Sequence, residues 1–268
     1  MLLLASLGSS VVQAHGDLQG QIDSVSARIK TDPGNAELYF RRAELYREHE
    51  EWSAASADYD QVEKMAPGND AVHLGRAKLL LASGRYEAAQ GELNRFLAAR
   101  PDHVDALVTR ARVREKLGQH ALAAEDFARA IQLANPPEPE FYLERAQALA
   151  SASPGHPEAA LACLDEGRAR LGPLPTLGLA AIDLEVGQRN FEAALARLDQ
   201  LSAGQKRQEM WLERRGDILV KADRSVSAVL AYRDAQKAIA RLPARQQGTQ
   251  SMQDMQARLK QKIASAAR

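Results

Sequence analysis

Residues 33–67 have the sequence PGNAELYFRRAELYREHEEWSAASADYDQVEKMAP, and residues 67–101 continue with PGNDAVHLGRAKLLLASGRYEAAQGELNRFLAARP. Each segment begins and ends with a proline, and each proline lies 34 residues from the next. Pro136 follows Pro101 by 35 residues. A fixed period of this length is typical of repeat proteins, in which every period forms one supersecondary unit. The sequence therefore predicts a stack of similar units.

Two columns of small residues share this period. Tyr39, Ala43 and Tyr46 follow an i, i+4, i+7 spacing, which places them on one face of a helix. The first column continues as Ala43, Ala77, Ala111, Ala146, Ala181 and Gly216, and the second consists of Ala55, Ala89, Ala123, Ala160, Ala194 and Ala228. Two columns at one period predict two helices per unit that approach closely at the small residues.

This pattern resembles the tetratricopeptide repeat (TPR) family, whose unit is a helix-turn-helix of 34 residues. The family's order of large, small, large, Ala, aromatic, Ala and Pro is matched by Tyr39, Ala43, Tyr46, Ala55, Tyr59, Val62 and Pro67. The fourth repeat departs from it with an insertion at 153–157, and the fifth fits only with one residue added before Phe191. The resemblance implies an all-α, right-handed superhelical solenoid of stacked helix-turn-helix repeats with terminal capping helices.

The chain divides on this basis into four parts. We expect a signal peptide at 1–14, an N-terminal cap helix within 15–35, six repeats over 36–242 and a C-terminal capping helix within 243–268. The repeats are expected at about 36–69, 70–103, 104–138, 139–174, 175–208 and 209–242. The closing helix is indicated by apolar residues at helical spacing, namely Met252, Met255, Leu259 and Ile263.

The first residues favour export. The run from Leu2 to Val12 is apolar apart from Ser and Gly, and Val12-Gln13-Ala14 supplies short side chains before His15, as a signal peptidase requires. The run is shorter than the roughly 20 residues that cross a bilayer, so no transmembrane anchor is predicted. The expected location is periplasmic or extracellular. The alternative is a cytoplasmic protein with a folded or disordered apolar N-terminus.

Charge and motif content argue against several function classes. The 35 Lys and Arg residues balance the 35 Asp and Glu residues, which disfavours a nucleic-acid partner. The phosphate-binding, dinucleotide-binding, zinc-protease and nucleophile-elbow motifs are all absent from the sequence, so we expect neither catalytic residues nor a cofactor. Cys163 lies in a helical run and is interpreted as a buried hydrophobic residue. A metal site at a processed N-terminal His15 is the less favoured alternative.

The resemblance also indicates where a partner would bind, because first helices line the concave surface of such solenoids. The fifth position of successive repeats is apolar, and mixed charges lie beside it. The candidate binding residues are Phe40, Arg41, Glu44, Arg47, Leu74, Lys78, Val108, Arg112 and Leu143, with Glu115 and Lys116 nearby. Family members that clamp chaperone C-termini have Lys and Asn where this chain has Phe40 and Glu44, so chaperone-tail binding is not predicted.

An arginine precedes the small residue of the first helix in five of the six repeats. These residues are Arg42, Arg76, Arg110, Arg145 and Arg215. We expect them to pair with carboxylates of the next repeat, which would make the column structural; the alternative is a ladder that binds anions. The favoured function is an exported, non-enzymatic scaffold that binds a protein or peptide. The alternatives are a cytosolic assembly or adaptor protein and a secreted metal-dependent accessory protein.

Overall fold

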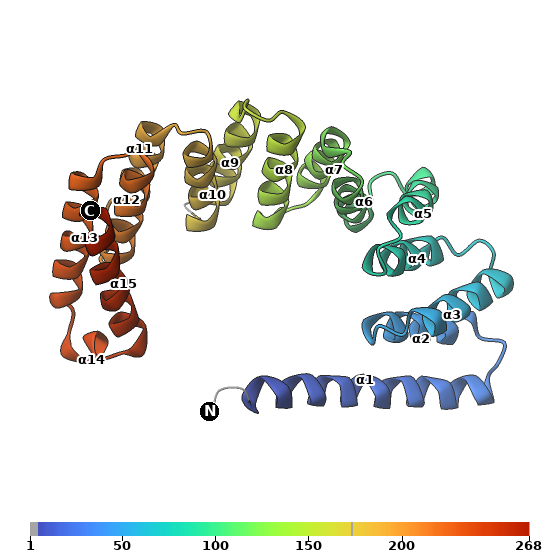
Figure 1. The fold of residues 1–268 in the computed structure, drawn as a ribbon. Helices are drawn as coiled ribbons and strands as arrows, with labels where there is room; N and C mark the ends of the chain where they lie inside the picture. The colour runs from blue at the N-terminus through green and yellow to red at the C-terminus, as the bar shows by residue number, and fades with distance from the viewer. Residues whose placement is uncertain (1–4, 173, 268) are drawn as a thin grey trace. The chain divides into compact units, whose positions relative to one another are not determined.

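The computed structural model describes residues 5–172 and 174–267, with side chains from residue 18 onward. Over these residues the regular secondary structure is entirely helical and consists of α1 to α15 (Figure 1). The predicted all-α class of stacked helix-turn-helix repeats is therefore confirmed. The chain separates into two compact halves, residues 1–137 and 138–268.

The N-terminal half holds one long helix and three helix pairs. The long helix is α1 (Ala5–Thr31). The pairs are α2 (Ala36–Glu48) with α3 (Trp52–Met65), α4 (Ala71–Ala82) with α5 (Tyr86–Ala99), and α6 (Val104–Lys116) with α7 (His120–Leu133). The expected prolines follow α1, α3, α5 and α7, where their missing N–H and ring prevent the helix from continuing.

The C-terminal half holds three more pairs and two final helices. The pairs are α8 (Pro139–Ala152) with α9 (Glu158–Leu171), α10 (Pro175–Gly187) with α11 (Phe191–Ser202), and α12 (Glu209–Lys221) with α13 (Ser225–Ala240). The short α14 (Ala244–Gln247) leads into α15 (Gln250–Ala266). The insertion at 153–157 lengthens the loop between α8 and α9.

Five of the six pairs share one three-residue turn. Its middle residue has a positive φ, with values of 63° at Glu50 and 58° at Arg189. The next residue closes the turn, since the Glu51 N–H donates to the Tyr46 carbonyl at 2.8 Å and the Asn190 N–H donates to the Glu185 carbonyl at 2.8 Å. The fifth repeat therefore has no extra residue in its turn. Its irregularity lies within α10, which buries both Ala181 and Ile182 completely.

Small residues form the helix contacts. The two columns of small residues are buried throughout the six repeats, and tyrosine rings pack against glycines of neighbouring helices. A Cβ added to Gly75 of α4 would lie 2.7 Å from the Tyr59 ring of α3, and one added to Gly216 would lie 2.2 Å from the Tyr232 ring. The absence of a side chain at these glycines therefore makes room for the tyrosines.

Helices α1 and α15 cover the outermost pairs of the two halves. Ile22, Val25 and Ile29 of α1 pack against Leu38 and Leu45 of α2. Helix α1 begins at Ala5, earlier than the expected 15–35 segment, and continues past the predicted cleavage site after Ala14. Met1–Leu4 lie outside the described residues, and the signal peptide stays a prediction.

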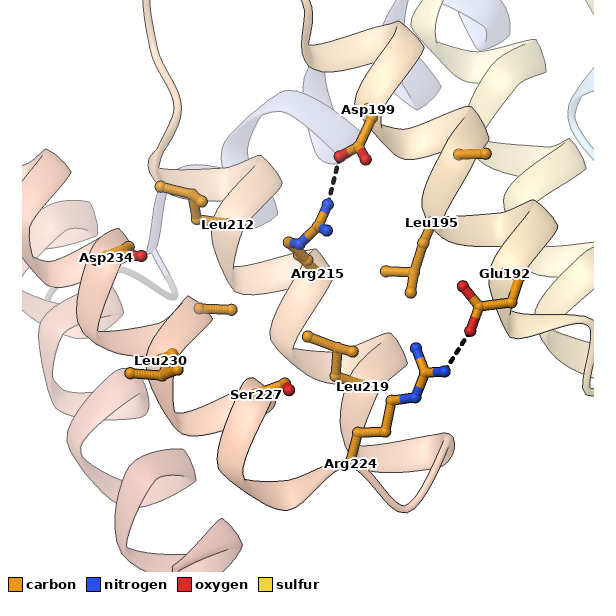
Figure 2. Close-up of a pocket in the computed structure, with 12 residues that line it drawn as sticks. Glu192, Leu195, Asp199, Leu212, Arg215, Leu219, Arg224, Ser227, Leu230 and Asp234 are labelled. Carbon is orange, nitrogen blue, oxygen red and sulfur yellow. Dashed lines mark hydrogen bonds and ion pairs between the residues drawn. The ribbon is translucent and has the colours of Figure 1, made fainter.

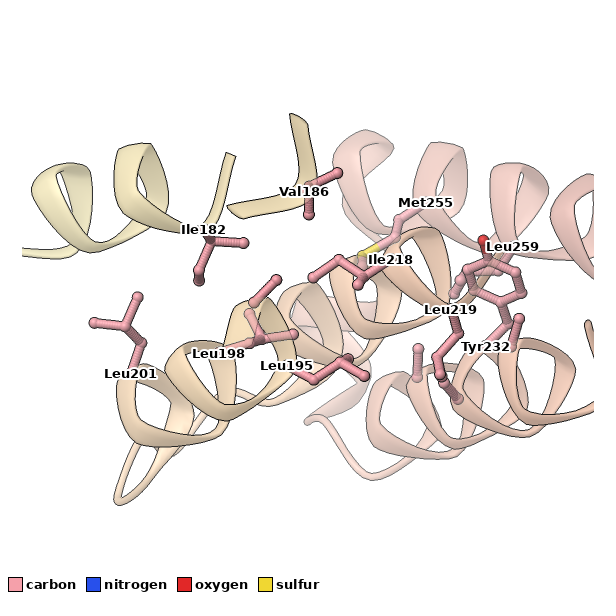
Figure 3. Close-up of a cluster of buried hydrophobic side chains, with 14 of the residues drawn as sticks. Ile182, Val186, Leu195, Leu198, Leu201, Ile218, Leu219, Tyr232, Met255 and Leu259 are labelled. Atoms are coloured by element: carbon pink, nitrogen blue, oxygen red, sulfur yellow. The ribbon is translucent and has the colours of Figure 1, made fainter. Parts of the chain in front are cut away.

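At the other end, α15 contributes to an apolar cluster of the C-terminal half. Met252, Met255 and Leu259 are buried with Tyr232 and Ile239 (Figure 3 shows Met255, Leu259 and Tyr232 together). The polar face of α15 stays in solvent, because its Gln253, Asp254 and Lys260 side chains are exposed. This helix therefore closes the apolar surface of the last pair.

Candidate binding surface

The apolar column predicted for partner binding is only partly accessible. Phe40 of α2 and Leu74 of α4 are half-buried, whereas Val108 of α6 is buried at 3% exposure. Phe40 also contacts the Tyr59 ring, with 6.0 Å between ring centroids. Val108 therefore belongs to the helix packing of the third repeat. Leu143 is half-buried on α8 in the C-terminal half.

Several of the charged residues predicted to bind a partner are held in place by ion pairs and hydrogen bonds within the protein. Glu44 accepts hydrogen bonds from the Tyr59 hydroxyl and from Arg47 Nη2, the latter at 2.9 Å. Burial, with the adjacent Glu44 carboxylate, raises the pKa of Tyr59 well above its ordinary value, so the phenol stays protonated and donates to Glu44. Lys78 Nζ lies 2.7 Å from Asp105 Oδ2, which links α4 to α6.

The second repeat supplies further apolar side chains that were not among the predicted site residues. Ala71 and Leu81 occupy the second and twelfth positions of the repeat and are half-buried, like Leu74. With Lys78, these residues follow an i, i+3, i+7, i+10 spacing, which places them on one face of α4. We call Ala71, Leu74 and Leu81 the α4 strip. Ala71 and Leu81 can be identified from the sequence, because helical spacing from Leu74 places both on the same face of the helix.

Charged residues lie on the neighbouring first helices. Glu44 and Arg47 belong to α2, and Asp105 and Arg112 belong to α6. Arg41 and Arg112 are exposed, whereas Glu44 and Arg47 are half-buried. The N-terminal half thus presents an apolar strip on its middle first helix with mixed charge on the first helices before and after it. This composition suits a peptide that carries apolar anchors and polar flanks.

The arginine column binds carboxylates, but not those of the next repeat. Arg42 binds Asp58 of its own repeat, and Arg76 lies 2.6 Å from both Asp60 and Glu63 of the preceding repeat. In the remaining repeats, the partners are Asp126 for Arg110, Glu166 for Arg145 and Asp199 for Arg215. The expected direction is therefore wrong, because these side chains face the second helices of their own and preceding repeats.

The same arginines also tie consecutive repeats together. Arg110 Nη1 donates to Asn94 of α5 at 3.1 Å, and Arg42 Nη1 donates to Ser26 of α1 at 3.1 Å. Ser26 and Asn94 each lie 16 residues before their arginine. Helix α1 thus takes the place that the second helix of a preceding repeat would occupy, which explains why it covers α2.

The described residues contain neither a metal-binding cluster nor a helix that could span a membrane. No group of three or more His, Cys, Asp or Glu side chains is placed to hold a metal ion in that part of the chain. The side chain of His15 lies outside the described residues, so the metal alternative is not tested. None of the helices in the described residues has the length and apolar character needed to cross a membrane.

Comparison with known proteins identifies the family. Two tetratricopeptide repeat family models match residues 46–112 and 179–243, one in each half of the chain. The chain is a tetratricopeptide repeat protein. Each match covers parts of at least two helix pairs, which agrees with the repeat spacing and with the shared turns. Tetratricopeptide repeats form scaffolds for interactions between proteins, so the family indicates this broad role.

One curated relative of this TPR protein is a tetratricopeptide repeat and J domain-containing co-chaperone of Cryptococcus neoformans. It is 29% identical over 89 residues, which represent 33% of this chain and 17% of the relative. The chain therefore matches only a small part of that protein's length.

Solved TPR structures show the same fold at low sequence identity. A TPR protein from Parabacteroides merdae has a TM-score of 0.56 and 17% identity, covering 97% of this chain and 96% of that one. The C-terminal part of a TPR protein from Cytophaga hutchinsonii has a TM-score of 0.65 and 15% identity, with coverages of 89% and 94%. At such identities, the likeness concerns the fold alone.

Proposed function

We propose that this TPR protein is an exported, non-enzymatic scaffold that binds a protein or peptide through the first helices of its N-terminal half. The α4 strip carries this proposal, because three apolar side chains lie on one face of a first helix and retain partial exposure. A bound segment would bury apolar anchors on the strip and place polar groups beside Glu44, Arg47 and Arg112.

The charged groups beside the strip support binding rather than catalysis. Glu44 is engaged by Tyr59 and Arg47, and Lys78 is engaged by Asp105. Charged groups held in place by such pairs present a fixed pattern of positive and negative charge, which favours a partner of complementary charge.

Export is supported by the apolar run that ends at Val12-Gln13-Ala14. Expression of the full chain in its native host, followed by mass determination of the purified protein, tests this part. Processing after Ala14 leaves a chain that begins with His15 and is recovered outside the cytoplasm. A chain that is recovered from the cytoplasm with its first 14 residues intact would contradict export.

The binding surface is tested by paired substitutions. Leu74→Glu with Leu81→Glu places two carboxylates on the strip, whereas Ala57→Glu with Gly91→Glu places two on exposed positions of α3 and α5. Both double variants are crosslinked in the native compartment, and the captured proteins are compared with those of the wild type. Loss of a partner in the strip variant alone supports the proposal. Unchanged capture by the strip variant, or equal loss in both variants, contradicts it.

A further inference from the structure

Helix α13 exposes two large apolar side chains at positions where other second helices have small or acidic residues. Val226 is 79% exposed and Leu230 is 55% exposed, and their i, i+4 spacing places them on one face. The corresponding exposed residues of other second helices are small or acidic: Ser53 and Ala57 in α3, Glu87 and Gly91 in α5, Ala121 and Glu125 in α7, and Glu192 and Ala196 in α11. We call Val226 and Leu230 the α13 ridge.

A groove of about 480 Å³ adjoins this ridge between α11 and α13. Leu195 of α11 and Leu212 and Leu219 of α12 line it, and Leu230 stands on its α13 side (Figure 2). Ion pairs of Arg215 with Asp199 and of Arg224 with Glu192 connect the walls. We call this the α11–α13 groove; its leucines can contact an inserted aliphatic side chain, and charged side chains, including Asp234, surround them.

The ridge separates this groove from a second one. Val226, Val229 and Leu230 line a hollow of about 450 Å³ together with Ala266 at the end of α15. Both hollows belong to the C-terminal half. A protruding apolar ridge beside a groove with leucine side chains among charged ones is self-complementary, because a two-fold axis can place the ridge of each copy in the groove of the other.

Charge on the same face selects the orientation of such a pair. Asp223, Val226, Leu230 and Arg233 are all exposed and follow one another at intervals of three, four and three residues. Antiparallel pairing that sets Val226 opposite Leu230 of the second copy also sets Asp223 opposite Arg233, because both pairs are centred on residue 228. Parallel pairing would place like charges opposite each other, which is unfavourable.

We propose that the α13 ridge and the α11–α13 groove form a homodimer interface, in which two copies of this chain pack with their α13 helices antiparallel. Asp223 is available for this contact, since its ion pair with Arg189 is long, at 3.9 Å, and exposed on both sides. One helix and one groove per copy form a small interface, below the about 1,200 Å² of stable complexes. The dimer is therefore reversible, with a dissociation constant on the order of micromolar.

Sedimentation velocity of the full chain over a wide concentration range tests this interface. The wild type is expected to show a rising weight-average sedimentation coefficient, and Leu230→Glu is expected to remain monomeric at every concentration. Ala57→Glu is the matched control, because Ala57 has the same exposed position on α3. A wild type that stays monomeric, or a Leu230→Glu variant that dimerises like the control, overturns the proposal.

A charge-swap pair tests the orientation independently of the apolar contact. Asp223→Arg and Arg233→Asp are each expected to weaken dimerisation by about tenfold, and the double variant is expected to restore it. Arginine is accommodated in this turn position, as Arg189 shows in the turn before α11. Thermal melts verify that each variant is folded. A double variant as weak as the single ones excludes the antiparallel register centred on residue 228.

Discussion

Arg110 binds both carboxylate oxygens of Asp126, with 2.8 Å from Nε to Oδ2 and 2.7 Å from Nη2 to Oδ1. Arg42 and Asp58 repeat this geometry two periods earlier, at 2.7 and 2.8 Å. Each pair joins the first helix of a repeat to its second helix, and the remaining guanidinium nitrogen reaches the preceding helix. The arginine column thus fixes how helices pack within and between repeats.

Removal of the Asp126 carboxylate is expected to destabilise the protein strongly. Asp126 is 5% exposed and also accepts from Arg114 at 2.6 Å, so Asp126→Ala leaves two half-buried guanidinium groups without their carboxylate. Breaking a buried pair costs about 3–5 kcal/mol. Denaturant unfolding measures this loss. Asp60→Ala is the control, because that carboxylate is exposed and its pair with Arg76 contributes about 1 kcal/mol or less. Equal losses in the two variants would contradict a structural role specific to buried pairs.

Glycine at position 50 is expected to stabilise the first repeat. Glu50 has a φ of 63°, whereas the corresponding turns of the next two repeats have Gly84 and Gly118. The left-handed conformation costs a residue with a side chain about 1–2 kcal/mol, so Glu50→Gly should raise the free energy of unfolding by roughly 1 kcal/mol. Gly84→Ala, the reverse change, should lower it. A destabilising Glu50→Gly would show that the Glu50 side chain has contacts that outweigh its backbone strain.

A methyl group at position 216 is expected to disrupt packing in the last repeat. The Cβ of Gly216→Ala would lie 2.2 Å from the Tyr232 ring, which must shift within a full core. Overpacking of this kind costs about 1–3 kcal/mol. Gly91→Ala is the matched control, because nothing lies within 4 Å of its added Cβ, and it should stabilise α5 by up to about 1 kcal/mol. Thermal unfolding of both variants checks the opposite signs; destabilisation by both would contradict the packing argument.

Stability is expected to fall in alkaline solution because of Cys163. Burial raises the pKa of its thiol to about 11, compared with about 8.5 in an unfolded chain. Between these values the unfolded chain loses the thiol proton while the folded chain retains it, so rising pH favours unfolding. The stability advantage of the wild type over Cys163→Ala should therefore be constant below about pH 8.5 and should shrink toward pH 11. A pH-independent difference would contradict a buried thiol.

Much of the fold follows directly from the period. Prolines at 34-residue intervals and two columns of small residues specify the helix pairs, because only small side chains allow that approach. The fifth repeat is harder to align because α10 buries Ala181 and Ile182 together, which a single small-residue column does not anticipate. The extent of α1 is also not evident, because the sequence pattern separates an apolar run from the cap helix, whereas the helix is continuous from Ala5 to Thr31 in the described residues.

The candidate site is less readable from sequence than the fold. Repeat position identifies the face of α4 on which Leu74 lies, but exposure depends on neighbouring helices, and these bury Val108 at the same repeat position. The ion-pair partners of the arginine column likewise depend on which adjacent helix has an Asp or Glu within ion-pair distance. These contacts depend on how neighbouring helices pack. Residue spacing assigns the arginines to one helix face but does not identify the carboxylates that they bind.

Site-specific photocrosslinking in the native host tests the central claim most directly. A photoreactive amino acid at Leu81 of the α4 strip and another at Gly91 on α5 report on two faces of the same repeat. Mass spectrometry then identifies any crosslinked protein. We predict that a protein partner is crosslinked from position 81 and not from position 91. A protein partner that is crosslinked from position 91 and not from position 81 would contradict binding along the first helices.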